Sequence, residues 1–544
     1  MRRRLLAVLL AAAAVAVVAQ PGSSTRGRDG GILRVLVSPF VYDTIDPALS
    51  YSPPGWLLLE ATCARLYTYP DETSPAGLRL QPEVAASYSR SEDLKTYTFT
   101  LRRGFRFSNG DPVRASAFAR AINRVLDPVV QSPGAIFMDD IVGAEDVRAG
   151  RAEKARGVVA YGYTLVVRFE RPTPNFLART ALPFFCAVPP WLPPSAEGIG
   201  KIPSAGPYYV KEYRAREGIV IRRNRFYGGD RTVHLDGFNV NLQGGNPVEL
   251  LRSVDRGDAD WGWMAAGVVY LAPGLDLEAK YGLNRSRFHV KPGLTLRMLA
   301  FNSSRPLFRN NPRLRRAVNL ALDRIAQVAA SYGPVASTAT DQHIPHGVPG
   351  FRDANVYPLQ GDLARARELA RGHLRSGKAV LHVTSNTLEI EIAQLVKKQL
   401  APIGLDIEIK AQPGGALWAA GLTELTRPGT IRRADWDLAF VLWAPNSPDP
   451  HEYLSLLLEM HLQGGETLTR PRSRFARAAL TRAARLPPGR SRNLAYAEVD
   501  EMIARDIAPV APLSVLNEAT LVSERVGCLI LRPALDLAAA CLKE

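Results

Sequence analysis

The sequence contains few cysteines and histidines, and it lacks the short motifs that most directly indicate enzymatic chemistry. None of its four cysteines forms a Cys-x-x-Cys motif, which excludes a zinc ribbon and a thioredoxin-type redox site. No Gly-x-Ser-x-Gly, His-Glu-x-x-His or Gly-x-x-x-x-Gly-Lys-Ser/Thr motif occurs either. A Ser/His/Asp triad is defined by geometry and not by order, so an exported hydrolase remains an alternative. Because none of the eight histidines lies in the context of a nucleophile, we expect no enzyme and no cofactor.

Long apolar runs are also scarce, and the one that stands out lies at the N-terminus. Residues 5–18 are apolar but too few to span a bilayer comfortably, and they follow the basic residues 2–4. Small residues around Ala19 favour cleavage there, so we expect a signal peptide over residues 1–19 and a flexible tether over residues 20–31. An uncleaved signal anchor is the alternative, and the absence of a nearby cysteine excludes a lipoprotein. The sequence therefore predicts export to the periplasm or to the outer face of the cytoplasmic membrane.

Export favours oxidised cysteines. Four cysteines allow three pairings. Among these we favour Cys63–Cys186 together with Cys528–Cys541, the second of which closes a short C-terminal loop. In the chain-entropy account, a loop of that length stabilises the fold by roughly 3 kcal/mol.

Acidic residues are outnumbered by basic ones. The chain has 68 Lys and Arg against 52 Asp and Glu, which gives a net charge of +16. The basic residues are scattered singly, and no basic stripe alternates with stacking aromatics, so we expect no nucleic-acid partner. For an exported protein, the excess indicates a solvated basic surface or attraction to an anionic envelope surface.

The length of 544 residues and the 46% hydrophobic content predict about three globular domains. A first strand is predicted at residues 32–37. A hairpin is predicted at residues 93–107, where Tyr97, Phe99 and Leu101 alternate with polar residues.

The second half of the chain is more regular. Asn311 caps a helix that begins at Pro312, and the apolar face of this helix is predicted to include Leu314, Val318, Ala321, Ile325 and Val328. Strands at residues 379–383, 405–409 and 436–443 then alternate with helices. This alternation predicts right-handed crossovers and a largely parallel sheet.

Polar side chains follow two of these strands at their carboxyl ends, where α/β sheets bind ligands. Ser385 and Asn386 follow one strand, and Asn446 follows Trp443 at the end of another. An indole provides a flat apolar surface, and the Asn446 amide has both a donor and an acceptor. The alternative is structural: Trp443 in the core, Asn446 in a turn, and Asn386 with Glu389 in a capping box.

Several blocks of sequence form an ordered series. They are GGILRV (30–35), PEVAASYSRSEDLKTYTFTLRRGFRFSNGDPV (82–113), SAGPYYVKEY (204–213), RRNRFYGG (222–229), FNSSRPLFRNNPRLRRAVNLALDR (301–324), WDLAFVLWAPNSPDP (436–450) and LAYAEVDEMIARDIAPVAPL (494–513). Any one block is weak, and the block at 82–113 is the most specific. In this order they resemble the peptide-type (family 5) extracytoplasmic solute-binding proteins of ABC transporters, over nearly the whole mature chain.

The resemblance implies an α/β, two-lobed periplasmic-binding-protein-like fold that is hinged, with mixed sheets and an extra small α+β domain inserted in lobe one. By analogy, lobe one holds residues 30–75, 190–290 and 517–544, the inserted domain residues 76–189, and lobe two residues 291–516. Cys63 and Cys186 then lie near the two crossings between lobe one and the inserted domain, which suits their pairing.

The resemblance also implies a mechanism and a set of partners. Solute binds to one lobe and is buried when the hinge closes, and a membrane permease recognises the closed form. The implied partners are a peptide or peptide-like solute and an ABC permease with cytoplasmic ATPases, and the implied receptor is a monomer. A sensor, a chaperone or a metal-chelate binder of the same fold is the alternative. His343 and His346 have the spacing for a metal, but they match a solvated loop of the family, so we expect no metal site.

The site residues implied by the resemblance include one departure from the family. Similar peptide binders place an Asp three residues after the strand-ending Trp, where it pairs with the α-ammonium of the peptide; that position is Asn446 here. An amide carries no full charge, so we predict that free-amine oligopeptides are poor ligands or that another acid binds the amine. Asp449 resembles the structural turn of the family. Trp418 matches an aromatic residue that lines side-chain pockets, and Tyr51 is expected to face the cleft from lobe one.

Overall fold

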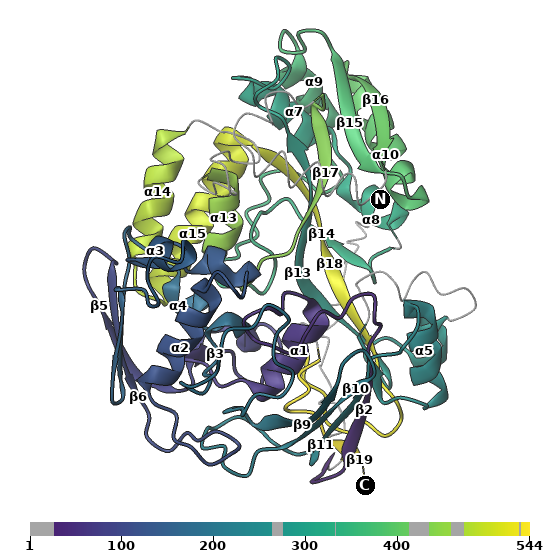
Figure 1. The fold of residues 1–544 in the computed structure, drawn as a ribbon. Helices are drawn as coiled ribbons and strands as arrows, with labels where there is room; N and C mark the ends of the chain where they lie inside the picture. The colour runs from purple at the N-terminus through teal and green to yellow at the C-terminus, as the bar shows by residue number, and fades with distance from the viewer. Residues whose placement is uncertain are drawn as a thin grey trace, which may run out of the picture.

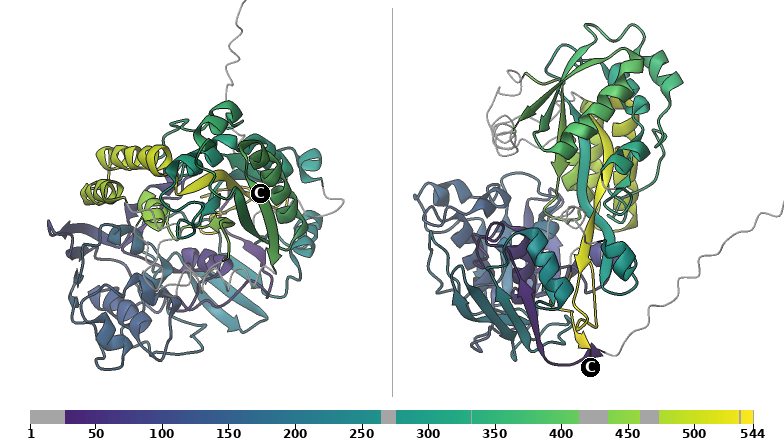
Figure 2. Two further views of the ribbon diagram at one scale, coloured as in Figure 1. Left: turned by 90° about the horizontal axis from the view of Figure 1, so that it is seen from above. Right: turned by 90° about the vertical axis from the view of Figure 1, so that its right-hand side faces the viewer.

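The computed structural model describes residues 27–263, 276–331, 333–412, 435–458, 473–532 and 535–543. The chain forms two lobes, and two long antiparallel strands, β13 (Phe288–Phe301) and β18 (Val510–Leu521), run from one lobe into the other (Figure 1). Figure 2 shows the same connection from the side. We call the lower lobe of Figure 1 lobe one and the upper lobe two. No helix within the described ranges is both long and apolar enough to cross a membrane.

Lobe one is built on a five-stranded mixed sheet with the strand order β12-β2-β11-β10-β9. The strand predicted at residues 32–37 is observed as β2, which pairs in parallel with β11 and β12 because crossovers separate them in sequence. The elements are β2 (Ile32–Leu36), α1 (Pro53–Thr62), β9 (Tyr208–Arg214), β10 (Gly218–Arg223), β11 (Gly237–Asn241), α5 (Pro247–Arg256), β12 (Trp261–Gly262) and α6 (Leu277–Tyr281).

Residues 27–31, which the sequence placed in the flexible tether, belong to lobe one. Strand β1 (Gly27–Arg28) pairs with β19 (Leu542–Lys543) near the other end of the chain. The Gly31 amide donates to Asp236 Oδ2 at 2.8 Å. The predicted signal peptide and the rest of the predicted tether lie outside the described residues.

A four-stranded antiparallel sheet, in the order β5-β6-β8-β7, packs beside the five-stranded sheet. The alternation predicted for residues 97–101 is observed on β6, where Tyr97, Phe99 and Leu101 are at most 3% exposed. The elements are β5 (Ala85–Arg90), β6 (Thr96–Leu101), α2 (Ala115–Leu126), α3 (Ala144–Arg148), β7 (Val158–Tyr161), β8 (Thr164–Arg168) and α4 (Phe176–Arg179). A small ribbon of β3 (Tyr67–Thr68) and β4 (Gln81–Pro82) precedes this sheet.

Two disulfides are present. Cys63, at the end of α1, is bonded to Cys186 across a sequence separation of 123 residues, with the two Cα atoms 5.3 Å apart. Cys528 is bonded to Cys541, with the Cα atoms 4.7 Å apart. The first disulfide attaches the segment that follows the four-stranded sheet to the helix of lobe one.

Lobe two is built on a six-stranded sheet in the order β14-β18-β13-β17-β15-β16. The three strands predicted by alternation, β15, β16 and β17, pair in parallel as expected. The sheet as a whole is mixed, because β13 and β18 enter from lobe one and pair antiparallel without a crossover helix. The strands are β14 (Ser337–Ala339), β15 (Lys378–Thr384), β16 (Asp406–Gln412) and β17 (Leu438–Trp443).

Helices cover both faces of this sheet. On one face Leu381 and Leu438 pack with helices α7 (Pro312–Ala321), α9 (Leu363–Ala370) and α10 (Thr387–Leu400). On the other face Leu296 and Met298 pack with helices α13 (Pro450–Leu458), α14 (Arg474–Arg485) and α15 (Arg490–Met502). Strands β13, β17 and β18 therefore contribute to two buried cores, which suits the continuous apolar run of β17, whereas β15 and β16 contribute to the first core.

The helix predicted to start at Asn311 ends earlier than its periodicity suggests. Leu322 and Asp323 leave the helical conformation, and Asp323 caps a second helix, α8 (Arg324–Ala330), by accepting from the Ala326 amide at 2.9 Å. The apolar face does not continue across this break, and Ile325 is 44% exposed. The prediction of Ile325 as a core residue was wrong because a capping Asp restarts the helical register.

Candidate functional site

Strand β17 ends on the side of lobe two that faces lobe one. Its last residue, Trp443, pairs with Leu296 on β13, and the chain then turns through residues 444–449 before α13. The Trp443 ring is partly buried against the core of lobe two, but no described residue accepts a hydrogen bond from its buried Nε1. We call residues 443–446 the corner.

Glu452, in the first turn of α13, holds the loop after Trp443 in place. The amides of Asn446 and Ser447 donate to Glu452 Oε2 at 2.8 and 3.3 Å, and the Ser447 hydroxyl donates to Glu452 Oε1 at 2.6 Å. Because its backbone is fixed in this way, Asn446 presents its side chain in one direction.

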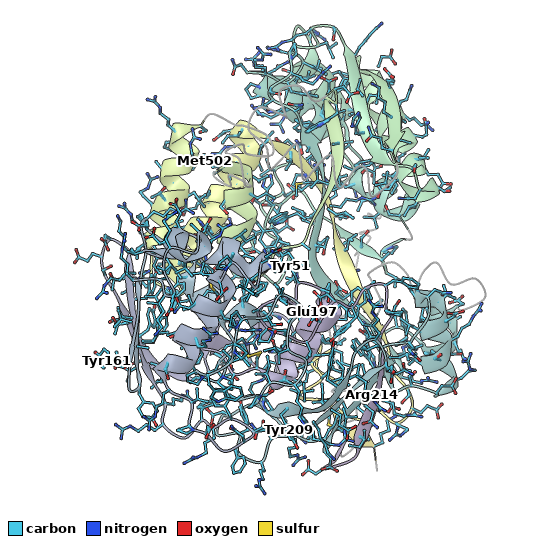
Figure 3. The ribbon with its side chains drawn as sticks, in the orientation of Figure 1. Tyr51, Tyr161, Glu197, Tyr209, Arg214 and Met502 are labelled. Atoms are coloured by element: carbon cyan, nitrogen blue, oxygen red, sulfur yellow. A yellow bond between two sulfur atoms is a disulfide. The ribbon has the colours of Figure 1, made fainter. Side chains whose placement is uncertain are left out.

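Tyr51 of lobe one meets Asn446 from the opposite side. The Tyr51 hydroxyl donates to Asn446 Oδ1 at 3.0 Å, across 395 residues of sequence. Asp43 orients the loop before α1, since Asp43 Oδ2 accepts from the Tyr51 amide at 2.5 Å and Asp43 Oδ1 accepts from the Ser52 hydroxyl at 2.6 Å. Figure 3 shows Tyr51 at the edge of lobe one that faces lobe two. Two residues proposed from the sequence are therefore brought together between the lobes.

Aromatic side chains surround Tyr51 on lobe one. Its ring centroid lies 5.6 Å from that of Trp56, 5.9 Å from that of Phe184 and 6.5 Å from that of Phe137. Trp56 lies on α1, whereas Phe137 and Phe184 lie in short helical turns near the four-stranded sheet. Sequence reasoning missed these three residues: Trp56 is close to Tyr51 in the chain, but Phe137 and Phe184 carry no local signal. The cluster supplies a flat apolar surface beside the polar corner.

The charged groups behind the corner are largely paired with each other. Arg492 donates to both carboxylate oxygens of Asp449, at 2.9 and 3.0 Å. Burial alone would raise the pKa of Asp449, but the Arg492 charge lowers it. This pairing agrees with the structural role predicted for Asp449. Burial also raises the pKa of Tyr69, and the charges of Asp449 and Glu452 act in the same direction.

Glu452 leads to a prediction about pH and stability. Burial raises its pKa to about 7, against an ordinary value of 4.5, although its hydrogen bonds with Ser447 and Asn446 oppose the shift. Between these two values the folded protein holds a proton that the unfolded chain has released. The preference of the folded state for protonated Glu452 therefore adds to the free energy of unfolding. This contribution is fully present below pH 4.5 and is lost as the pH rises towards about 7, where the free energy of unfolding falls by about 1.4 kcal/mol per pH unit.

We expect Glu452→Gln to abolish this contribution. The free energy of unfolding of the wild type, minus that of the variant, should fall between about pH 5 and about pH 7 in urea titrations. Burial lowers the pKa of His451 to about 4, which gives a slope of the opposite sign, but His451 is present in both proteins and its effect cancels in the difference. A difference that does not change with pH would contradict the assignment.

The remaining residues proposed from the sequence lie elsewhere. Ser385 and Asn386 are exposed at the carboxyl end of β15, and within the described ranges no hydrogen bond joins either to the corner. Asn386 caps α10 by accepting from the Glu389 amide at 2.9 Å, while the Glu389 carboxylate pairs with Arg297, so half of the predicted capping box forms. Trp418 lies outside the described residues.

The two histidines considered for a metal are not adjacent ligands. His343 is fully buried, and its Nδ1 lies 2.6 Å from Asp500 Oδ1. The His346 ring packs on Phe351 at 5.1 Å between centroids. In the described part of the chain, no group of three or more His, Cys, Asp or Glu side chains is placed to hold a metal ion.

Comparison with known proteins relates this architecture to a family. Residues 79–461 match the family model described as bacterial extracellular solute-binding proteins, family 5 Middle. The oligopeptide-binding protein OppA of Bacillus subtilis (strain 168) is 26% identical over 417 residues, which cover 71% of each chain. The probable D,D-dipeptide-binding periplasmic protein DdpA of Escherichia coli (strain K12) is 23% identical over 429 residues, which cover 77% of this chain and 76% of that one.

Solved structures share the fold over almost the whole chain. A clavulanic acid biosynthesis oligopeptide binding protein superposes with a TM-score of 0.81 at 24% identity, covering 95% of this chain and 96% of the other. The periplasmic murein tripeptide binding protein MppA, in its unliganded open form, superposes with a TM-score of 0.76 at 20% identity, covering 95% and 99%. The relatives are binding proteins and not enzymes, and their fold has the two lobes seen here. The chain belongs to the family 5 bacterial extracellular solute-binding proteins.

Proposed function

We propose that this protein captures a peptide or peptide-like solute between its lobes and delivers it to an ABC importer. The observation that carries the proposal is the Tyr51–Asn446 hydrogen bond, which joins the two lobes at the carboxyl end of a sheet strand. The aromatic cluster around Tyr51 supplies a surface for apolar parts of a solute. The names of the relatives, which include oligopeptide-binding and dipeptide-binding proteins, support a peptide-like solute.

Closure requires a hinge, and we place it in the strands that connect the lobes. The pairing of β13 with β18 is irregular between Pro292 and Leu296, opposite Asn517. A Cβ at Gly293 would lie 2.4 Å from the Leu516 carbonyl oxygen, so this close approach requires glycine. Proline and glycine interrupt the ladder here, and small backbone rotations at this point reorient the lobes.

The hinge position agrees with the domain division that the family resemblance implies. We propose lobe one as residues 30–75, 190–290 and 517–544, the inserted domain as residues 76–189, and lobe two as residues 291–516. Contacts join the proposed inserted domain to lobe two, since Leu78 is buried in one cluster with Met298 and Ile344, and Arg90 donates to the Arg485 carbonyl at 3.2 Å. We also propose an exported monomer, in the periplasm or at the outer face of the cytoplasmic membrane, with an ABC permease and its ATPases as partners.

The corner favours a solute group that accepts hydrogen bonds. Tyr51 takes one of the two lone pairs of Asn446 Oδ1, and the amide nitrogen of Asn446 donates to no described residue and faces the solute as a donor. The neighbouring Trp443 Nε1 is a second donor without a partner among the described residues. Glu452 is buried behind the loop and engaged with Asn446 and Ser447. We therefore propose that the corner binds a neutral carbonyl, such as that of a blocked peptide N-terminus, in preference to a free ammonium.

Calorimetry with matched tri- and tetrapeptides, N-acetylated or free, tests this proposal. We expect the wild type to prefer the acetylated peptides. Asn446→Asp should shift the preference towards free amines by about tenfold, because a charge-assisted hydrogen bond is roughly twice as strong as a neutral one. The control is Asn386→Asp, which makes the same change of charge at an exposed helix cap where Asp is equally suitable.

Small-angle scattering should show the protein contracting when a peptide binds. If no peptide of either kind contracted the protein or produced heat, the proposed function would be wrong. If peptides bound but Asn446→Asp left the preference unchanged, only the assignment of the corner would be wrong.

A further inference from the structure

The outer surface of helix α14 and of the start of α15 is rich in arginine, and the first acidic residue that follows is the exposed Glu498 of α15. Residues 473–497 include six arginines and no aspartate or glutamate. One of the six, Arg492, is buried and paired with Asp449. For the other five, no ion pair is formed with any residue that the structure describes. Elsewhere in lobe two the exposed Arg352 and Arg505 have carboxylate partners, whereas the exposed Arg313, Arg365 and Arg371 form no ion pair with a described residue. Residues 473–497 are therefore distinguished by the number of arginines on two neighbouring helices.

Helix α14 divides cleanly into two faces. Its small apolar residues, including Ala476, Leu480 and Ala483, are buried against the neighbouring helices. The opposite face exposes Arg474, Phe475, Arg482 and Arg485. Phe475 is 66% exposed, so a large apolar side chain faces solvent among these arginines. We call Arg474, Phe475, Arg482, Arg485 and the exposed Arg490 the basic patch.

The basic patch lies on the outside of the molecule, where a membrane surface can contact it. Figures 1 and 2 show α14 on the outside of lobe two, beyond α13 and α15 and away from strands β15 and β16. Leu494 on α15 is also 48% exposed beside it. Arg90 of the four-stranded sheet donates to the Arg485 carbonyl at 3.2 Å, which extends the positive surface towards lobe one.

We propose that the basic patch docks on an anionic phospholipid surface, with Phe475 at the level of the headgroups. Clustered arginines on an exposed helix face are suited to an anionic lipid surface, and the exposed Phe475 ring among them can lie at the level of the headgroups. A shape-complementary protein interface is instead depleted of charge at its centre. Each arginine near an anionic leaflet adds to the attraction, and the net charge of +16 draws the whole molecule towards it. Such docking holds an exported receptor near the membrane whatever solute it carries.

Sedimentation of the full-length protein with vesicles tests the proposal. We expect binding to vesicles of phosphatidylcholine containing about one third phosphatidylglycerol, and little binding to pure phosphatidylcholine. The variant Arg474→Gln/Arg482→Gln/Arg485→Gln should bind roughly 100-fold more weakly, since each arginine near the surface contributes about fivefold. Phe475→Ser should reduce the part of the binding that persists at high salt.

The matched control removes three positive charges from the far end of the molecule. Lys211, Arg214 and Arg216 are exposed on and after β9, and Figure 3 places Arg214 low on lobe one, opposite Met502 of α15. Lys211→Gln/Arg214→Gln/Arg216→Gln should change vesicle binding by less than about threefold. Equal weakening by both triple variants would mean that net charge alone acts, and this would overturn the proposal. Binding only to vesicles that carry the permease would also overturn it, because the partner would then be a protein.

Discussion

Replacing Cys63 and Cys186 with alanine is expected to lower the free energy of unfolding by about 5 kcal/mol. The disulfide closes a loop with a sequence separation of 123 residues, and in the chain-entropy account the stabilisation grows with the logarithm of the loop length. Both cysteines are buried at the junction of α1 with the segment after the four-stranded sheet. The measurement is urea unfolding of the oxidised wild type and the double variant, followed by circular dichroism.

The second disulfide provides the matched comparison. Cys528 and Cys541 are 13 residues apart, so their replacement should cost about 3 kcal/mol by the same relation. The expected result is therefore a larger loss at the longer loop. If removal of Cys528–Cys541 cost as much as removal of Cys63–Cys186, loop length would not explain the stabilisation.

The first disulfide matters for function because of what α1 carries. The loop before this helix holds Tyr51, and the helix itself holds Trp56 of the aromatic cluster. Phe184, two residues before Cys186, contacts both rings. The disulfide therefore fixes the lobe-one side of the proposed binding surface from two directions. Closure of the lobes then moves that surface as one unit.

Local patterns in the sequence predicted local structure well. The alternation of Tyr97, Phe99 and Leu101 correctly indicated strand β6, although the hairpin predicted over residues 93–107 was wrong because β6 pairs with β5 and β8. Asn311 followed by Pro312 correctly predicted the start of a helix. These signals depend on neighbours within a few residues, so they can be recognised in a single sequence. The same logic failed at Ile325, where a single Asp at position 323 ended the register.

The site required contacts that local patterns do not encode. The pairing of Tyr51 with Asn446 depends on how the two lobes are placed, and the sequence analysis proposed each residue for the site without predicting their contact. Phe137 and Phe184 join the cluster only because their chain segments pack together, so neither carried a signal. For Asn386 the sequence predicted two roles, a helix cap and a ligand contact, and the structure shows the cap. A residue type suited to two roles is assigned only by its neighbours in space.

Replacing Arg124 with methionine is expected to cost about 3–5 kcal/mol of stability, the second large effect. Arg124 on α2 donates to both carboxylate oxygens of Asp46 at 2.6 Å, and the two side chains are 1% and 0% exposed. Removing the cation leaves a buried carboxylate whose remaining donors, among the residues that the structure describes, are the backbone amides of Ala48 and Ile199. Urea unfolding of the single variant measures the loss. Because Asp46 lies in the loop that leads to Tyr51, peptide binding should weaken as well.

The double variant Arg124→Met/Asp46→Asn separates the cost of the unpaired Asp46 charge from the cost of losing the Arg124 side chain. An amide at position 46 keeps an acceptor for one backbone amide and carries no charge, so at least half of the lost stability should return. The control is Arg102→Met, which breaks the exposed pair with Asp230 and should cost at most about 1 kcal/mol. If the double variant were as unstable as Arg124→Met alone, the stranded charge would not be the cause. The loss would then come from the packing of the Arg124 side chain and its 2.9 Å hydrogen bond to the Pro193 carbonyl.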